Sequence, residues 1–123
     1  MALFRELDGT VLFLEWLDEL NARDRKVAAK CRARLRRLGE FGNELRRPVA
    51  DFLRDGIYEL RLEVGGVNYR ILYFFGAGVA AVVSHGIAKE TRVPNIEIER
   101  ALDRKRRFER DPDRYGYYEE EDH

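Results

Sequence analysis

The stretch that decides the fold is GIYELRLEVGGVNYRILYFFGAGVAAVVSHGIAK, residues 56–89. It predicts three consecutive antiparallel strands. Gly65-Gly66 links the first two strands, and paired glycines favour a tight hairpin turn because glycine adopts positive φ without steric cost. A tight turn fixes the register of the pairing. It sets Val64 opposite Val67, Leu62 opposite Tyr69, Leu60 opposite Ile71 and Tyr58 opposite Tyr73.

The same register separates the two faces of the sheet. The face formed by these pairs is apolar, and we expect it to be the core face. The pairs on the other face are Glu63 with Asn68, Arg61 with Arg70, and Glu59 with Leu72. Two arginines directly opposite each other repel and destabilise the pairing. We therefore expect Glu59 to neutralise one arginine and a bound phosphate to neutralise the other.

The second turn, Gly76-Ala77-Gly78, leaves the position of His85 open. A two-residue loop places His85 on the face of the two arginines. A three-residue loop that pairs Phe75 with Val79 places His85 on the core face instead, because a shift of one residue exchanges the faces. The sequence favours neither loop.

Helical periodicity precedes and follows the strands. We expect a short edge strand over 2–6, helices over 10–20, 24–38 and 96–110, and a connection over 39–55. The prediction is an α+β fold with two N-terminal helices, a three- to four-stranded antiparallel sheet and a C-terminal helix. Helices cover one face of such a sheet, so the face with Arg61 and Arg70 is expected to stay open. Residues 1–112 form one domain, and residues 113–123 form a flexible acidic tail.

The composition of the 123 residues indicates a folded protein with no net charge, since 45% are hydrophobic and 23 basic residues balance 23 acidic ones. No overall field therefore attracts nucleic acid. Residues 23–54 nevertheless hold eleven Lys and Arg against four acids. The single cysteine, Cys31, excludes an internal disulfide. The sequence shows no signal peptide and no apolar run of membrane-spanning length, so we expect a cytoplasmic protein without a membrane partner.

The candidate chemistry rests on cations rather than on a metal or a nucleophile. Two histidines and one cysteine, far apart in the sequence, make a poor metal site, so we expect no metal and no cofactor. No phosphate-binding glycine loop or nucleophile elbow is present. The residues gathered on or near the sheet are Arg61, Arg70, Lys89, Arg92 and, depending on the turn, His85. Cations without compensating acids are suited to holding a phosphodiester.

Several ordered motifs resemble the RelE/HigB-type toxin superfamily, and within it the phage-derived Gp49-like group. They include Gly56-x-Tyr58-Glu59-Leu60-Arg61, Tyr69-Arg70-Ile71-Leu72-Tyr73, His85-Gly86-x-x-Lys89 and Pro94 before Glu97-Ile98. The segment LEWLDEL, residues 14–20, resembles the first helix of the group. The resemblance spans roughly residues 10–110. It implies a RelE/ParE-like fold and the toxin role in a type II toxin–antitoxin pair.

The resemblance also implies an activity, which is ribosome-dependent cleavage of mRNA without a metal. In that reaction the ribose 2′-OH attacks the adjacent phosphate. At the matching positions, Arg61 and Arg70 would hold the phosphate, Lys89 would stabilise charge or activate the hydroxyl, and His85 would serve as acid or base. The basic helix over 24–38, with Lys30, Arg34 and Arg37, would contact RNA backbone, and so would Arg92.

Two departures from the group keep other functions open. Many relatives carry two adjacent lysines where this chain has Lys89 followed by Glu90, and ribosome-directed toxins tend to be basic. The alternatives are a toxin with another target, such as DNA gyrase, and a non-catalytic binding protein that keeps the fold. The partners implied are an antitoxin with a helix-turn-helix domain, mRNA and the ribosome. A homodimer could form through an edge strand or the last helix.

Overall fold

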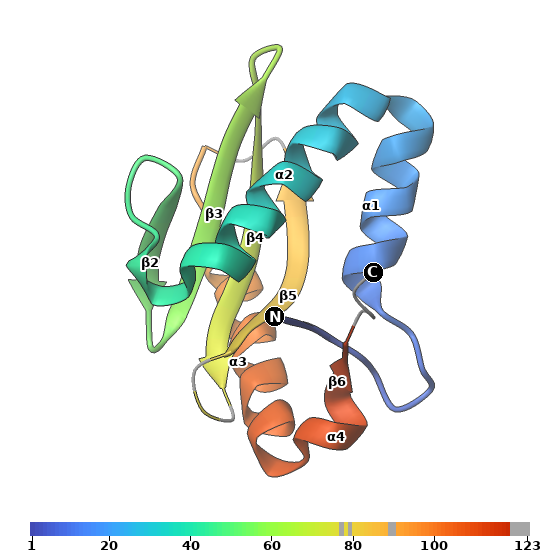
Figure 1. Ribbon diagram of the computed structural model, residues 1–123, viewed down its shortest axis with the longest axis vertical. Helices are drawn as coiled ribbons and strands as arrows, with labels where there is room; N and C mark the ends of the chain where they lie inside the picture. Colours follow the sequence, from blue (N-terminus) through green and yellow to red (C-terminus); the bar gives the residue numbers. More distant parts are fainter. Residues whose placement is uncertain (77, 79, 89–90, 119–123) are drawn as a thin grey trace.

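The computed structural model describes residues 1–76, 78, 80–88 and 91–118. Figure 1 shows a sheet with helices on both of its sides. The elements in chain order are β1 (Ala2–Phe4), α1 (Leu12–Arg23), α2 (Arg25–Phe41), a 3-10 turn η1 (Gly42–Glu44), β2 (Ala50–Arg54), β3 (Ile57–Val64), β4 (Val67–Gly76), β5 (Ala80–Ala88), α3 (Asn95–Arg110), α4 (Pro112–Tyr115) and β6 (Gly116–Tyr117).

The predicted register of the first hairpin is confirmed. Val64 lies opposite Val67, and the pairing continues without a shift through Arg61 opposite Arg70 to Tyr58 opposite Tyr73. Gly65 and Gly66 both have positive φ, 58° and 80°, as the tight turn requires. The α+β class is also confirmed, and β3, β4 and β5 form the antiparallel centre of the sheet.

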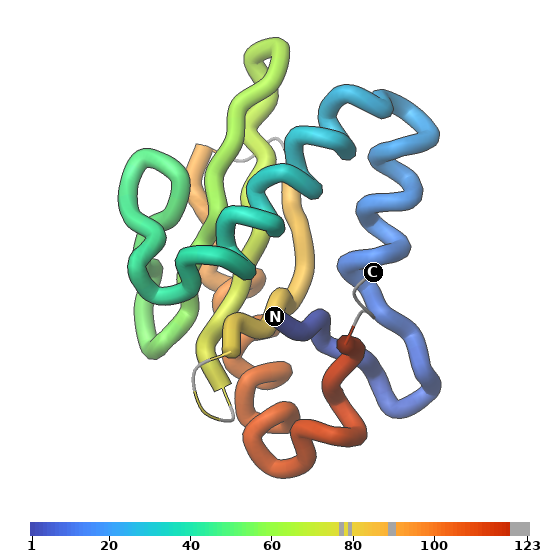
Figure 2. Tube along the Cα trace, viewed as in Figure 1, coloured from blue at the N-terminus to red at the C-terminus, as the bar shows by residue number. Residues whose placement is uncertain are grey.

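The sheet is larger than predicted and is not purely antiparallel. The described residues form six strands in the order β2-β3-β4-β5-β1-β6, in which β1 pairs parallel with β5 and β6 pairs antiparallel with β1. Figure 2 shows the N-terminal segment beside β5 and the C-terminal strand beside that segment. The added strands β2 and β6 have five and two residues, too few to give a sequence pattern of their own.

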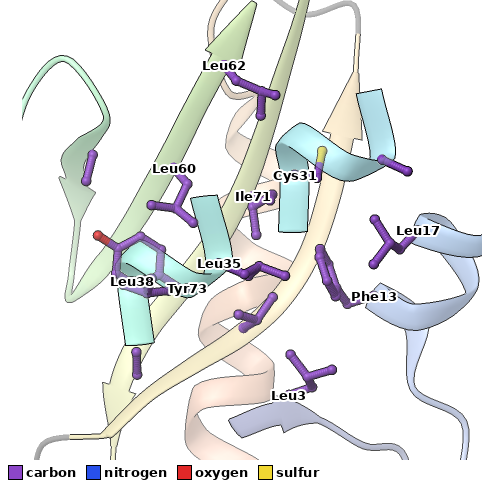
Figure 3. Packing of buried hydrophobic residues seen from close by; sticks show 14 of the residues in the cluster. Leu3, Phe13, Leu17, Cys31, Leu35, Leu38, Leu60, Leu62, Ile71 and Tyr73 are labelled. Carbon is purple, nitrogen blue, oxygen red and sulfur yellow. The ribbon is translucent and has the colours of Figure 1, made fainter. Parts of the chain in front are cut away.

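The prediction that one face of the sheet stays open is wrong, because helices cover both faces. A core on one face joins α1 and α2 to the sheet, and Figure 3 shows Phe13, Leu17 and Leu35 pointing into it. A second core on the other face joins α3 to Leu72, Phe74 and neighbouring residues of the sheet. The sequence missed this arrangement because α3 follows the strands and its apolar stripe does not reveal which face it covers.

Helix α2 begins and ends at identifiable caps. The Asp24 carboxylate accepts hydrogen bonds from the backbone amides of Lys26 and Val27, and so satisfies two amides of the first helical turn that have no partner within the helix. The helix passes through Gly39, where the sequence predicted its end, and stops at Gly42, which has a φ of 52°. No helix in the described part of the chain has the length and apolar composition needed to cross a membrane.

Regular structure extends further along the chain than the tail prediction allows. Residues 113–117, which the sequence assigned to a flexible tail, contribute to α4 and β6. The ring of Tyr115 stacks on Phe4 at 5.6 Å between centroids, and the Arg5 amide donates to the Tyr115 carbonyl at 2.8 Å. These contacts fix the segment against β1. Residues 119–123 lie outside the described residues.

Gly86 allows α1 to lie directly on the sheet. A Cβ added at Gly86 would come within 2.5–2.6 Å of three ring atoms of Trp16, closer than non-bonded atoms approach. We expect Gly86→Ala to lower the free energy of unfolding by about 1–3 kcal/mol, because the ring or the helix must shift. Urea unfolding followed by circular dichroism measures the change.

The control for this substitution is Gly39→Ala inside α2, where an added Cβ meets no atom within 4 Å. We expect this variant to be as stable as wild type or more stable, because alanine favours the helix by about 1 kcal/mol. Equal stabilities for the two variants would show that Trp16 does not need the space above Gly86.

Candidate functional site

Arg61 and Arg70 lie opposite each other as predicted, but they do not share an open surface. The Arg61 side chain is 44% exposed, whereas that of Arg70 is 7% exposed. The difference follows from their strands. Arg61 lies on β3 beyond its pairing with β2, while Arg70 lies on β4 between β3 and β5. The expected pair of exposed guanidinium groups is therefore one exposed and one buried group.

Glu59 compensates the charge of both arginines. Nη1 of Arg70 donates to both carboxylate oxygens of Glu59 at 2.9 Å, and Nε of Arg61 lies 3.5 Å from Oε1. Nη2 of Arg70 donates to the carbonyl of Thr91 at 2.5 Å, which ties the chain before α3 to the sheet. The sequence assigned Glu59 to one arginine and a phosphate to the other. Instead, a carboxylate of the protein contacts both, so folding does not depend on an external anion.

A shallow cleft of about 250 Å³ brings Arg61 and Arg70 together with a third arginine. Nε of Arg34, on α2, donates to the carbonyl of Arg61 at 3.1 Å. This contact is available because β2 pairs with β3 only as far as Leu60, which leaves an edge for α2 to reach. We call this site the cationic cleft; its lining residues are Arg34, Pro48, Arg61, Leu62, Glu63, Asn68, Tyr69 and Arg70.

The other predicted RNA contacts lie outside the lining of the cleft. Lys30 and Arg37 are exposed on α2, four residues before and three after Arg34, and therefore share its side of the helix. Arg92 is exposed and follows Thr91, whose carbonyl accepts from Arg70. Lys89 lies outside the described residues. The cleft thus lies within a wider cationic surface that includes one flank of α2.

A bulge in β5 decides the position of His85. Gly76 pairs with Ala80, and Tyr73 pairs with Val83. If this register continued unchanged, His85 would lie opposite Ile71 on the core face. The register shifts by one residue at Ser84, so His85 lies opposite Leu72 on the face of the arginines. The sequence reasoning considered the length of the turn alone and did not include this bulge.

His85 lies beneath α3 rather than in the cationic cleft. Its side chain is 11% exposed. Nδ1 lies 2.7 Å from Oγ of Ser84 and 2.8 Å from Nη1 of Arg104, and a guanidinium can only donate, so Nδ1 is an acceptor. Nε2 then carries the proton and faces Glu97 at 3.6 Å. The ring fixes α3 to the bulge, and His85 is not among the residues that line the cleft.

Burial is the main cause of the unusual acidity of His85. The pKa of His85 is lowered from 6.5 to about 4, because burial disfavours the charged imidazolium and the Arg104 guanidinium repels it. Glu97 acts in the opposite direction with a smaller effect. The imidazole is therefore neutral at physiological pH. This state suits a structural hydrogen-bond acceptor.

Three polar lining residues of the cationic cleft, Glu63, Asn68 and Tyr69, were not selected from the sequence as site residues. Glu63 and Asn68 form the cross-strand pair next to Arg61 and Arg70, and Tyr69 precedes Arg70. The predicted register already set Glu63 and Asn68 beside the arginines, so that register could have found them. The Glu63 carboxylate and the Asn68 amide lie on the face of the arginines, whereas the Tyr69 side chain lies on the core face. The described residues contain no cluster of His, Cys, Asp or Glu that could hold a metal.

Comparison with known proteins supports one family. The family model of phage-derived Gp49-like proteins (DUF891) matches residues 15–106, about three quarters of the chain. The match begins within α1 and ends within α3, so it includes every residue of the cationic cleft. No curated protein matches the chain.

Loss of the Glu59 carboxylate should destabilise the sheet strongly. Glu59→Gln leaves the Arg70 guanidinium buried without a counter-charge, and we expect the free energy of unfolding to fall by about 3–5 kcal/mol. Glu63→Gln is the matched control on the same strand, exposed and outside the ion pairs of the described residues, with an expected change of about 0.5 kcal/mol or less.

The double variant Glu59→Leu/Arg70→Met tests the cause, since replacing both charged groups removes the unpaired charge. We expect it to recover most of the lost stability in urea unfolding. A single variant Glu59→Gln that is as stable as Glu63→Gln would contradict the assigned role of Glu59.

Acidification should destabilise the protein through His85. The unfolded chain binds a proton near pH 6.5, whereas the folded state keeps His85 neutral down to about pH 4. The stability present above pH 6.5 is therefore lost as the pH falls through this window, by up to about 3 kcal/mol. We expect the variant His85→Gln, whose amide oxygen still accepts from Arg104, to lose less.

The measurement is urea unfolding of both proteins at about pH 7 and about pH 4.5, so that the difference removes the contribution of shared carboxylates. Parallel losses in wild type and His85→Gln would show that His85 does not titrate in this window.

Proposed function

The chain belongs to the phage-derived Gp49-like family, a group of RelE/HigB-type toxins, and from this we propose that it arrests translation by cleaving RNA held in the cationic cleft. The observation that carries the proposal is that three arginines, from α2, β3 and β4, are among the residues that line one hollow. A guanidinium binds phosphate through two parallel hydrogen bonds, so such a hollow is suited to a nucleic-acid backbone.

The arginines have different roles in this proposal. Arg34 and the exposed Arg61 bind the phosphate directly. Arg70 forms the inner wall and holds Glu59, which orients Arg61 through the 3.5 Å contact. Because the Glu59 carboxylate already offsets part of the positive charge of Arg61 and Arg70, the cleft binds a phosphate with moderate affinity. Release of the product is thereby favoured.

The proposed reaction uses the substrate's own hydroxyl as the nucleophile. The ribose 2′-oxygen bonds to phosphorus as the bond to the 5′-oxygen breaks, which leaves a 2′,3′-cyclic phosphate and a free 5′-hydroxyl. Glu63, on the same face of the sheet as Arg61, accepts the 2′ proton, and a water molecule donates a proton to the leaving oxygen. Arg61 and Arg34 stabilise the charge that grows on the phosphate. Lys89 remains a proposed contributor.

The wider cationic surface supports action at the ribosome. Lys30 and Arg37 extend the cleft along α2, and no cation of α2 forms an ion pair with another described residue. An unneutralised helix face of this kind suits the ribosomal RNA backbone, which carries charge but needs no base recognition there. In this proposal the protein acts in the cytoplasm on ribosome-bound mRNA. Its partner is an antitoxin with a helix-turn-helix domain.

A second candidate function is RNA binding without cleavage. It is favoured by the burial of Arg70 against Glu59 and by the neutral, buried state of His85, which together leave the cleft fewer free catalytic groups. Such a protein would block translation by occupying RNA. The two functions differ in one observable, which is the appearance of new mRNA ends.

Paired variants on the two flanks of α2 test the proposal. We expect induced expression of the wild type to stop growth and to produce new mRNA 5′ ends, and Arg34→Ala/Arg61→Ala to abolish both. The control, Arg32→Ala/Arg36→Ala, removes equal charge from the other flank and should remain toxic. When RNA binding by the purified protein is measured at several salt concentrations, the logarithm of the binding constant falls linearly with the logarithm of the salt concentration. Loss of two phosphate contacts should reduce the magnitude of this slope by about 1.4.

The outcomes separate the functions. New 5′ ends that depend on Glu63 support cleavage, whereas arrest that depends on Arg34 and Arg61 without new ends supports binding alone. Arrest with damaged DNA and intact mRNA, unaffected by either arginine pair, would contradict an RNA target.

A further inference from the structure

One flank of α2 carries a line of cations that ends in an aromatic ring. At 3.6 residues per turn, positions 30, 34, 37 and 41 lie within about 60° of one another around the helix axis. Lys30 and Arg37 are exposed, and Nε of Arg34 donates to the carbonyl of Arg61 on the sheet. We call Lys30, Arg34, Arg37 and Phe41 the α2 stripe.

Phe41 is an exposed side chain at the end of the α2 stripe. It is 46% exposed, and neither hydrophobic core of the described residues includes it. Phe41 is the last residue of α2, and the chain turns away at Gly42, whose φ is 52°. The Cζ atom of Arg37 lies 5.9 Å from the centre of the Phe41 ring. The fold therefore places an accessible ring directly beside a cation.

The end of α2 does not suit a phosphate group. The last carbonyls of a helix give its C-terminus a partial negative charge. Two exposed carboxylates, those of Glu40 and Glu44, lie close to Phe41 in the chain. Phosphate contacts are consequently confined to the three cations of the α2 stripe. The ligand group that lies on Phe41 must be planar and uncharged.

A line of cations that ends in a free ring is suited to a single-stranded nucleic acid. The phosphates of the strand lie against the cations, and an unstacked base lies on the aromatic side chain. A duplex does not offer this contact, because its bases are stacked on one another. The α2 stripe therefore favours an unpaired strand as its ligand.

The α2 stripe is continuous with the cationic cleft. Arg34 belongs to both, and it lies seven residues before Phe41, which is about 10 Å along the helix axis. Arg37 lies between them, about 6 Å from Phe41 along the axis. A strand with a phosphate in the cleft can thus follow the helix and place a nearby base on the ring.

We propose that Phe41 stacks on an unpaired base of an RNA strand whose backbone lies in the cationic cleft and along the α2 stripe. This inference rests on the proposed function, because it takes RNA to be the ligand of the cleft. The cations contact only the backbone, whereas Phe41 requires a base that is free of its own stack. The site thereby selects single strands over duplexes, whether or not the protein cleaves them.

Two RNA probes of about eight nucleotides test the proposal, an ordinary single strand and the same ribose–phosphate chain without bases. Affinities are measured by fluorescence anisotropy with the full chain. We expect Phe41→Ala to bind the ordinary strand about tenfold more weakly than wild type, and the abasic strand within about twofold of wild type. Lys30→Ala should weaken both probes by the same factor, because it removes a phosphate contact.

Further variants separate the aromatic ring from its apolar bulk. Phe41→Trp should keep the affinity, and the ordinary strand but not the abasic one should quench its added fluorescence over that of Trp16 in wild type. Phe41→Leu should bind as weakly as Phe41→Ala. The matched control is Phe52→Ala, which removes a 53% exposed ring from β2 and should leave both affinities unchanged.

Three outcomes would overturn the proposal. These are an equal loss of affinity for both probes in Phe41→Ala, full affinity in Phe41→Leu, and a loss in Phe52→Ala as large as that in Phe41→Ala. Binding that Arg34→Ala/Arg61→Ala abolishes and Phe41→Ala leaves unchanged would refute the role of Phe41 while supporting the RNA function. Absence of binding of either probe to wild type would refute both.

Discussion

The contact between the Glu59 carboxylate and two arginines is the interaction on which the rest of the structure depends. The β3–β4 register that buries the apolar pairs also forces Arg61 and Arg70 to face each other, and one carboxylate offsets their repulsion. The same contact fixes the inner wall of the cationic cleft, and the bond from Arg70 to Thr91 leads the chain towards α3. Stability and candidate site therefore share one buried ion pair.

The register of the first hairpin could be predicted from the sequence because Gly65-Gly66 determines it locally and because only one phase buries Leu60 and Ile71. The family could also be recognised from the ordered motifs that follow. The bulge at Ser84 could not be predicted from the sequence, since the one-residue shift in β5 goes together with a contact between Ser84 and Arg104, which lies on a helix distant in the sequence. The strand β1 was predicted, but it lies between β5 and β6 rather than at the edge of the sheet, and β6 was not predicted, because their pairing is decided by neighbours far along the chain.

The candidate site was predictable in its residues but not in its exposure. Arg61, Arg70 and Arg34 line one cleft, and the basic character of α2 was evident from composition. The burial of Arg70 depends on its central strand and on α3, which the hairpin pattern does not reveal. His85 shows the same limit: its position in a toxin-like motif suggested proton transfer, whereas its surroundings fix it as a hydrogen-bond acceptor beneath α3.

Helix α2 forms a wall of the cationic cleft and also of a second hollow, of about 590 Å³, that is lined by residues of α1, α2, β1 and β6. The Nε of Arg34 bonds the helix to the edge of β3. A displacement of this helix by a ligand on one side changes the position of the guanidinium on the other. Thermodynamic linkage then requires the effect to be reciprocal. If the first ligand changes the affinity for the second by some factor, the second ligand changes the affinity for the first by the same factor. A molecule bound on the far side of α2 that moves the helix therefore changes the affinity of the cationic cleft for its ligand without covering the cleft, and a ligand in the cleft changes the affinity for that molecule by the same factor.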